Sequence, residues 1–184
     1  MKHEIETKTP GTVLLITGPA ASGKTTLAAV VAELPGWVRI SEDDYWARHK
    51  WHGLRTEEQE TTVQKEVMQD LRKLVDQGQN VALEFILYKT PPNPLTKYIA
   101  SLRKTNTTLN VVVLKPDLST IVAQMHQRGR PGDLNDLENR NSYAVSQIAC
   151  LEDGSIDPSW VIDTPGLTPI EVFDLVIARV ENKK

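Results

Sequence analysis

The residues best suited to chemistry lie near the start of the chain, in the stretch GPAASGKT at 18–25. Two glycines, Gly18 and Gly23, frame four small residues, and Lys24 and Thr25 follow the second glycine directly. Glycines let a backbone curl until successive N–H groups point at one anion. An ammonium and a hydroxyl at the next two positions add a positive charge and an oxygen ligand for a metal ion. The spacing therefore predicts a phosphate-binding turn.

The flanking residues support this prediction. TVLLI precedes the turn as an apolar, β-branched run of strand length, and TLAAVVAEL follows it as a helix-forming stretch. A phosphate turn needs this strand-to-helix setting, because the N-terminus of the helix adds partial positive charge. We expect ATP and Mg²⁺ as ligands, with Lys24 on the β- and γ-phosphates and Thr25 on the metal ion. The expected nucleotide-binding residues of the turn are Gly18, Ala21, Ser22, Gly23, Lys24, Thr25 and Thr26.

A nucleotide site alone does not separate a kinase from a GTPase or a motor ATPase. The chain has no Asn-Lys-x-Asp stretch for guanine recognition and no apolar strand that ends in paired acids. The first absence argues against a GTPase and the second against a motor ATPase, which leaves a kinase as the favoured class.

Acidic residues follow the second expected strand, in SEDDYW at 41–46. In a parallel sheet the carboxyl ends of neighbouring strands face one crevice, so Asp43 and Asp44 should lie near the γ-phosphate. A kinase needs a carboxylate there to orient an acceptor hydroxyl and take its proton. Spacing alone barely separates Asp43 from Asp44 as this base. The alternative is that both acids only cap or solvate a loop.

Glu84 is the second acid of interest, because it interrupts the apolar strand NVALEFIL at 80–87. A buried carboxylate is costly unless it binds something. Glu84 could hold Mg²⁺ through water or bind the acceptor. The alternative is a structural pair with a nearby lysine or arginine.

Arginines cluster in a later segment, RGRPGDLNDLENRNSY from 128. We expect residues 128–141 to form a short lid, in which Arg128 and Arg130 stabilise charge on the transferring phosphoryl group. These two arginines are preferred to Arg140 for this role. The alternative is a solvated loop at the end of a helix.

The acceptor side is predicted from YWARHKWHGLR at 45–55, where aromatic and cationic residues alternate. Aromatic rings beside cations can stack on a substrate or hold an anionic one. Equally, the aromatics could pack under a loop while the cations face water. His49 and His52 lack the further ligands that a metal site needs. The candidate acceptor residues are Asp43, Asp44, Trp46, Arg48, Glu84 and Tyr88, with Lys89 a weaker candidate.

Strands are expected at about 12–17, 37–40, 80–87, 109–114 and 160–163, and helices at about 24–34, 56–77 and 118–127 and from 168. Thr56–Gln59 and Thr168–Glu171 have capping-box spacing. Continuous apolar strands separated by helices predict a three-layer α/β sandwich around a parallel sheet.

Composition sets broader limits. The 184 residues suit one domain, with residues 1–10 as a loose lead-in. The formal net charge of −3 argues against a broad electrostatic grip on nucleic acid. A single cysteine and the lack of an apolar run of membrane-spanning length predict a cytoplasmic protein without a membrane partner. Oligomeric state leaves no trace in the sequence.

With GPAASGKT, ISEDDYW, VALEF and RGRPG…NR in this order, the chain resembles small P-loop kinases. It is most similar to the group that contains the polynucleotide 5′-kinase domain, chloramphenicol phosphotransferase and zeta-toxin-like enzymes. The resemblance implies sheet order 2-3-1-4-5, Asp43 as the base, and an adenine site near Asp163–Gly166, including Pro165 and Gly166. Members of the group often carry an arginine three residues after the base, where this chain has Trp46, and Arg48 could compensate.

Together these observations predict an ATP- and Mg²⁺-dependent kinase that phosphorylates a hydroxyl of a small molecule. Lys24, Asp43, Arg128 and Arg130 are the expected catalytic residues, and Thr25 and Glu84 the expected metal ligands. Two alternatives stay open: a nucleotide or polynucleotide 5′-hydroxyl kinase, and a nucleotide-binding regulator without an acceptor.

Overall fold

The apolar run after Gly11 forms β1 (Val13–Gly18), and every residue of this strand is buried. It is the central strand of a five-stranded sheet in the computed structural model, which describes residues 9–51, 55–88, 94–129 and 137–181. The other strands are β2 (Trp37–Ser41), β3 (Asn80–Ile86), β4 (Leu109–Lys115) and β5 (Val161–Asp163). All pairings are parallel, in the order β2-β3-β1-β4-β5. The predicted fold class and strand order are therefore confirmed.

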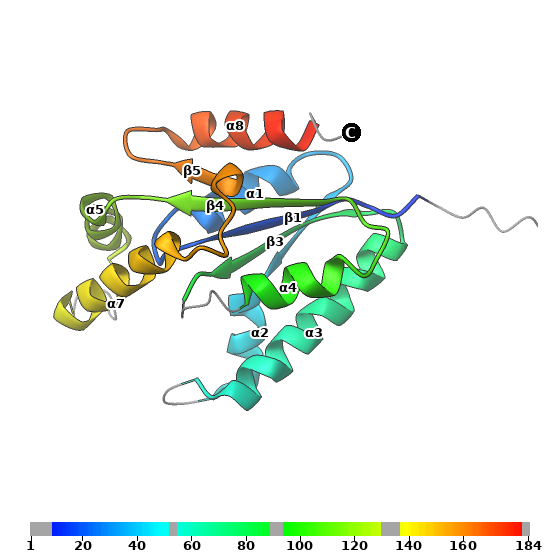
Figure 1. Ribbon diagram of the computed structural model, residues 1–184, viewed down its shortest axis with the longest axis horizontal. Helices are drawn as coiled ribbons and strands as arrows, with labels where there is room; N and C mark the ends of the chain where they lie inside the picture. The colour runs from blue at the N-terminus through cyan, green and yellow to red at the C-terminus, as the bar shows by residue number, and fades with distance from the viewer. Residues whose placement is uncertain (1–8, 52–54, 89–93, 130–136, 182–184) are drawn as a thin grey trace, which may run out of the picture.

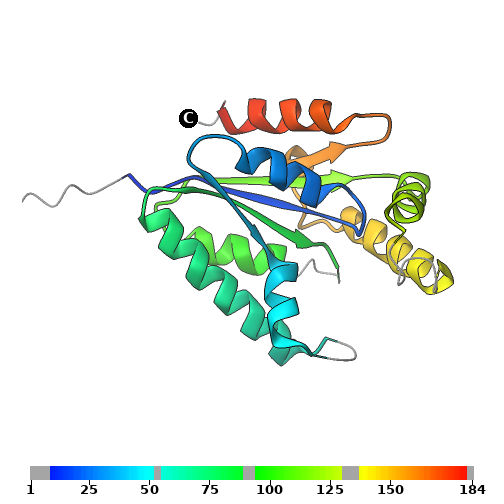
Figure 2. The same cartoon turned by 180° about the vertical axis from the view of Figure 1, so that it is seen from behind.

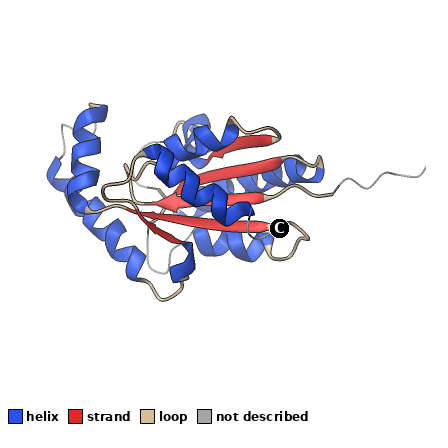
Figure 3. Cartoon of the chain, turned by 90° about the horizontal axis from the view of Figure 1, so that it is seen from above, coloured by secondary structure: helices blue, strands red, loops and turns tan. Residues whose placement is uncertain are grey.

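Helices cover both faces of this sheet (Figures 1 and 2). On one face, α1 (Lys24–Ala32) and α8 (Pro169–Glu181) pack against the side chains of β1 and β4. Seen from above, α8 lies across the strands (Figure 3). The opposite face is covered by α3 (Glu57–Asp76) and α4 (Leu95–Leu102), together with the last turn of α7 (Leu137–Ala149). The result is the predicted three-layer sandwich.

Local sequence signals explain where the long helices begin. Thr56 and Gln59 form a reciprocal capping box at the start of α3, as predicted. At the start of α8, the Thr168 backbone and hydroxyl donate to the Glu171 carboxylate, while the Glu171 N–H donates to the Thr168 hydroxyl. These reciprocal bonds satisfy backbone donors that the first helical turn leaves unpaired.

The SEDDYW segment, for which the sequence analysis predicted no helix, is helical. It forms α2 (Glu42–His49), which starts directly after β2 and packs against α3. Three acids occupy its first turn and two basic residues its last, an order that the helix dipole favours. The helix ends at Lys50, whose positive φ of 52° breaks the helical path.

Four further helical segments went unpredicted. They are α4, α7, the 3₁₀ turn Cys150–Glu152 and the 3₁₀ turn Pro158–Trp160. The expected lid, residues 128–141, also contains more regular structure than predicted. Its first residue, Arg128, is the last residue of α5 (Leu118–Arg128), and α7 begins within it at Leu137. Residues 130–136, and with them Arg130, lie outside the described residues, as do His52, Lys89 and residues 1–8 of the expected lead-in.

Candidate active site

The turn between β1 and α1 has the backbone shape that a phosphate cradle requires. Gly23 precedes α1 with a φ of 88°, a conformation that residues with a Cβ atom rarely adopt. Gly18 sits so close to β4 that a Cβ atom would lie 2.6 Å from the Leu114 carbonyl oxygen. The two glycines of the motif therefore serve different purposes: one bends the chain and the other lets the turn approach the sheet.

Lys24 lies folded against this turn. Its Nζ donates to the Pro19 carbonyl at 2.5 Å and to the Ser22 hydroxyl at 3.3 Å. Burial lowers the pKa of Lys24 to about 8, an effect opposed by the charges of Glu84 and Asp43 and reinforced by Arg128. Charges from β3, α2 and α5 thus converge on the lysine of the turn.

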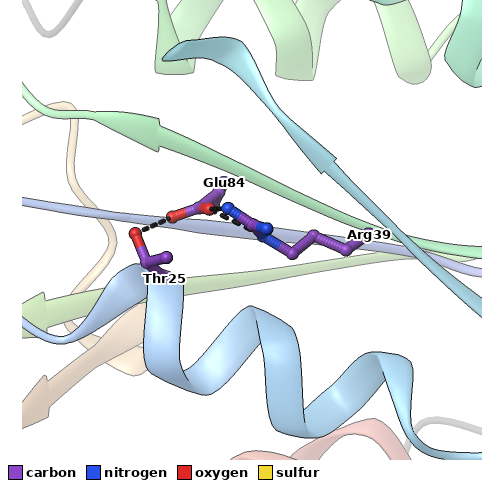
Figure 4. Close-up of polar contacts among 3 residues, drawn as sticks. All are labelled: Thr25, Arg39 and Glu84. Atoms are coloured by element: carbon purple, nitrogen blue, oxygen red, sulfur yellow. Dashed lines mark hydrogen bonds and ion pairs between the residues drawn. The ribbon is translucent and has the colours of Figure 1, made fainter. Parts of the chain in front are cut away.

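The first turn of α1 is tied to the sheet through Glu84 of β3 (Figure 4). The Thr25 hydroxyl donates to Glu84 Oε2 at 2.8 Å, and Arg39 of β2 donates to Glu84 Oε1 through both Nε, at 2.8 Å, and a terminal nitrogen. Glu84 is only 4% exposed. The structural pair with an arginine is therefore observed, and the same carboxylate also contacts Thr25, the predicted metal ligand.

Oxygen chemistry at this point fits Mg²⁺. A threonine hydroxyl and a carboxylate oxygen lie in direct contact, and Mg²⁺ binds few protein oxygens and completes its shell with water and phosphates. Among the described residues, no group of three or more His, Cys, Asp or Glu side chains could hold a metal by itself. Thr25 and Glu84 are accordingly the pair that would hold the ion of a bound nucleotide.

Asp43 and Asp44 both lie exposed in the first turn of α2. The Asp43 side chain is 80% exposed, with one carboxylate oxygen 3.7 Å from the Arg55 guanidinium. Its charge acts on Lys24 and on Glu42, so Asp43 lies near enough to the phosphate turn to influence the lysine of that turn.

Beside Asp43, the acceptor side is built on Trp46. The Trp46 indole donates to the buried Glu42 carboxylate at 3.1 Å, and the Arg55 guanidinium lies 4.2 Å from the indole centroid. Arg48 instead lies over the ring of Tyr45, at 4.2 Å. His49 contacts Glu66 at 3.0 Å and stacks on Trp51. The cation that lies beside Trp46 is therefore Arg55, whereas Arg48 lies on Tyr45.

Tyr88 lies half-buried where the chain leaves β3. Burial, with the charges of Glu60 and Glu42, raises the pKa of its hydroxyl. The structure thus brings Tyr88 to the same corner as Glu42, the residue before the predicted base.

The arginine segment is only partly described. Arg128 ends α5, and its charge contributes to lowering the pKa of Lys24. Arg140 falls within α7. Pro165 and Gly166 follow β5, and Pro165 borders a cavity of about 440 Å³ between the start of α5 and α7. That cavity lies where the adenine site was predicted.

Three residues of this region were missed by the sequence interpretation: Glu42, Arg39 and Gln147. Gln147 of α7 accepts a hydrogen bond from the Ala20 N–H of the phosphate turn at 2.7 Å. Arg39 left a signal, because it is a charged residue inside an otherwise apolar strand. Glu42 and Gln147 left none, since their roles depend on contacts between distant segments. Arg55 belongs to the cationic stretch at 45–55 but was not singled out within it.

Comparison with known proteins places the chain. A family model described as an AAA domain (AAA_33) matches residues 13–146, and the chain belongs to this family. A search of curated protein sequences finds no significant match. In the part of the chain that the structure describes, no helix is both long and apolar enough to cross a membrane.

Solved structures share the fold at low identity. A sugar kinase from a Janibacter species is 19% identical, with a TM-score of 0.69, over 94% of this chain and 95% of that chain. A gluconokinase from Sinorhizobium meliloti is 19% identical, with a TM-score of 0.62, over 95% and 96%. The tunicamycin resistance protein of Deinococcus radiodurans is 17% identical, with a TM-score of 0.66, over 93% and 96%. The chain has the fold of the small P-loop kinases.

Proposed function

We propose that this protein is an ATP-dependent phosphotransferase that moves the γ-phosphoryl group of ATP to a hydroxyl of a small-molecule acceptor. The observation that carries the proposal is the convergence on one turn of a lysine, a hydroxyl–carboxylate pair and a separate acidic side chain. A nucleotide-binding module needs the first two. A separate, exposed acid beside the phosphate turn is what transfer to an acceptor requires.

Each residue has a defined part in this reaction. The backbone of residues 18–25 and the Lys24 ammonium hold the phosphates, and Arg128 adds positive charge from the end of α5. Thr25 and Glu84 would hold Mg²⁺, which neutralises phosphate charge when bound. Asp43 accepts the proton of the acceptor hydroxyl, whose oxygen bonds to the γ-phosphorus while the bond from that phosphorus to the bridging oxygen of ADP breaks.

Arg39 holds the Glu84 carboxylate in position. Its two bonds to one Glu84 oxygen leave the other oxygen directed at Thr25. The carboxylate is therefore fixed before any ligand arrives, which saves the cost of ordering it during the reaction.

Asp43→Asn is the test of this function. We expect ATP consumption with Mg²⁺ to rise in the presence of at least one acceptor from a panel of sugars, sugar acids, nucleosides, aminoglycosides and 5′-hydroxyl oligonucleotides. Asp43→Asn should lower this acceptor-dependent turnover by about 10²- to 10⁴-fold, the range for loss of a general base. The affinity for ATP should stay within a few-fold of wild type.

Asp44→Asn is the matched control, because it removes the neighbouring exposed carboxylate from the same helical turn. Loss of turnover in Asp44→Asn alone would reassign the base. Tight ATP binding with no stimulation by any acceptor class would contradict the kinase and favour a nucleotide-binding regulator.

A further inference from the structure

We propose that Arg55 binds an anionic group of the acceptor, so that the substrates of this protein are hydroxy compounds that also carry a carboxylate or a phosphate. This inference rests on the proposed kinase function and adds the chemical class of its acceptor. Carboxylate and phosphate share the chemistry at issue, which is a pair of oxygens that match the planar guanidinium fork.

The position of Arg55 is the first argument. Its guanidinium lies 3.7 Å from a carboxylate oxygen of Asp43, the proposed base, and its side chain is 39% exposed. An acceptor whose hydroxyl reaches this oxygen of Asp43 therefore comes close to Arg55. At 3.7 Å the two groups attract each other through space but are too far apart for a hydrogen bond. The ion pair thus leaves the N–H groups of Arg55 available to a ligand.

Arg55 is also held in place before a ligand binds. Its guanidinium lies over the Trp46 indole, 4.2 Å from the ring centroid, a contact that restricts the side chain while it stays 39% exposed. Fixing a long side chain in advance removes much of the entropy that binding would otherwise cost.

Trp46 is in turn anchored by a buried chain of hydrogen bonds. Its Nε1 donates to one oxygen of Glu42 at 3.1 Å, and the hydroxyl of Tyr98 in α4 donates to the other oxygen at 2.7 Å. Glu42 is 2% exposed and Tyr98 is 1% exposed. A rigid support beneath an exposed guanidinium is the arrangement expected of a recognition site rather than of a solvated surface arginine.

The surrounding acids do not oppose an anionic ligand as strongly as their number suggests. Glu42 and Glu60 are both buried, so neither carboxylate faces the acceptor. Both oxygens of Glu42 already accept hydrogen bonds, from Trp46 and from Tyr98. Arg128 acts on Lys24 of the phosphate turn, and Arg39 is paired with Glu84. Arg55 is the cation that the structure pairs with Asp43.

Matched pairs of acceptors test this inference by turnover. Gluconate is compared with sorbitol, and adenosine 3′-monophosphate with adenosine, so that each pair differs chiefly in one anionic group. We expect transfer to favour an anionic member. Arg55→Met should raise the acceptor KM by about 10- to 100-fold, the range for loss of a charged hydrogen bond, with the KM for ATP unchanged. The acceptor KM of Arg55→Lys should lie between those of wild type and Arg55→Met, because lysine keeps the positive charge but not the planar guanidinium fork.

Arg72→Met is the control for the loss of one positive charge, since Arg72 donates to Ser101 on the far side of α3. Arg48→Met is the rival, because Arg48 stacks on Tyr45 at the same 4.2 Å. A raised acceptor KM in Arg48→Met and not in Arg55→Met would overturn the assignment. Turnover confined to sorbitol, adenosine or other neutral acceptors would leave the kinase intact and overturn the inference.

Calorimetric binding gives a second readout that needs no turnover. The protein is first saturated with Mg²⁺ and a non-hydrolysable ATP analogue, so that the phosphate turn cannot take up the added anion. Gluconate or adenosine 3′-monophosphate should then bind to wild type at least tenfold more tightly than to Arg55→Met. If neither anion binds more tightly to wild type than to Arg55→Met, or if neither anion binds at all, the inference is overturned, whatever the outcome for the proposed function.

Discussion

At the scale of single residues, the site depends on a lysine whose pKa is lowered toward neutral pH. Lys24 is pressed against the Pro19 carbonyl and the Ser22 hydroxyl, and burial lowers its pKa to about 8. A bound triphosphate would supply the negative charge that this ammonium lacks. Nucleotide binding and protonation of Lys24 should therefore be coupled.

This coupling gives a pH-dependent prediction. Between pH 8 and about 10.5, the ordinary pKa of lysine in the unfolded chain, the unfolded state holds a proton that folded Lys24 has released. The free energy of unfolding of wild type should therefore rise through this range relative to Lys24→Met, and the difference should be constant below it. Urea denaturation of both proteins at pH 7, 8, 9 and 10 measures this difference.

Lys97→Met, which removes an exposed ammonium from α4, is the control for general charge effects. A wild-type curve that runs parallel to the Lys24→Met curve from pH 7 to 10 would contradict the buried position of Lys24. A saturating amount of MgATP should move the rise to higher pH, because the triphosphate keeps the ammonium charged.

Among single residues, the phosphate turn was predictable and its acceptor side was not. GPAASGKT carries its function in local spacing, so Lys24 and Thr25 could be assigned without a fold. The choice between Arg48 and Arg55 depends on how the chain returns from α2 to α3, which no local pattern encodes. Glu84 was partly predictable. The cost of burying its carboxylate indicated that it has a partner, but the sequence did not show that Arg39 and Thr25 both bond to it.

At the scale of elements, Glu84 links three segments that the sequence separates widely. It lies on β3, its arginine partner on β2 and its threonine partner at the start of α1 (Figure 4). The parallel register places Glu84 opposite Ser41 of β2 and Ile16 of β1. The carboxylate of Glu84 thus joins β2, at the edge of the sheet, to the first turn of α1.

Arg39→Leu should weaken this link. The substitution leaves a nearly buried carboxylate without its cation, and we expect a loss of about 1–3 kcal/mol in the free energy of unfolding. The partial exposure of Arg39, at 33%, keeps the loss below that of a fully buried pair. The affinity for MgATP should also fall, because Glu84 is no longer fixed beside Thr25. Urea denaturation and nucleotide titration measure the two effects.

Lys115→Leu is the matched control, since Lys115 pairs with Glu152 at 3.2 Å where both side chains are exposed. Exposed pairs contribute about 0–1 kcal/mol, so this variant should be nearly as stable as wild type. Equal losses in both variants would show that burial of Glu84 carries no special cost.

The elements that the sequence predicted share one property, which is a strong local period or cap. All five strands and the helices with capping boxes were expected within a few residues of their observed bounds. By contrast, α2 is rich in charge and α4 is one short segment after a run of prolines. Both are stabilised by tertiary contacts, such as the bond from Tyr45 to Asp70 and that from Tyr98 to Glu42. Contacts of this kind are invisible to local pattern.

At the scale of the whole molecule, β1 lies between two separate apolar layers. Leu14 and Ile16 point into the layer formed with α1 and α8, whereas Val13 and Leu15 point into the layer formed with α3 and α4. The phosphate turn emerges directly from the end of this strand. Its position is therefore set by packing on both faces of the sheet, and damage to either layer should reach it.

Leu14→Ala and Leu15→Ala test this dependence with one substitution in each layer. Both leucines are fully buried, so each variant should lose about 2–5 kcal/mol in the free energy of unfolding. Leu175→Ala, at a 45% exposed position of α8, should change it by only about 0.5 kcal/mol. Tryptophan fluorescence follows both layers, because Trp37 packs against one and Trp160 against the other. A single shared transition in urea is expected in all three variants. If Leu15→Ala instead unfolded its own layer while MgATP binding survived, the turn would depend on the α1 and α8 side alone.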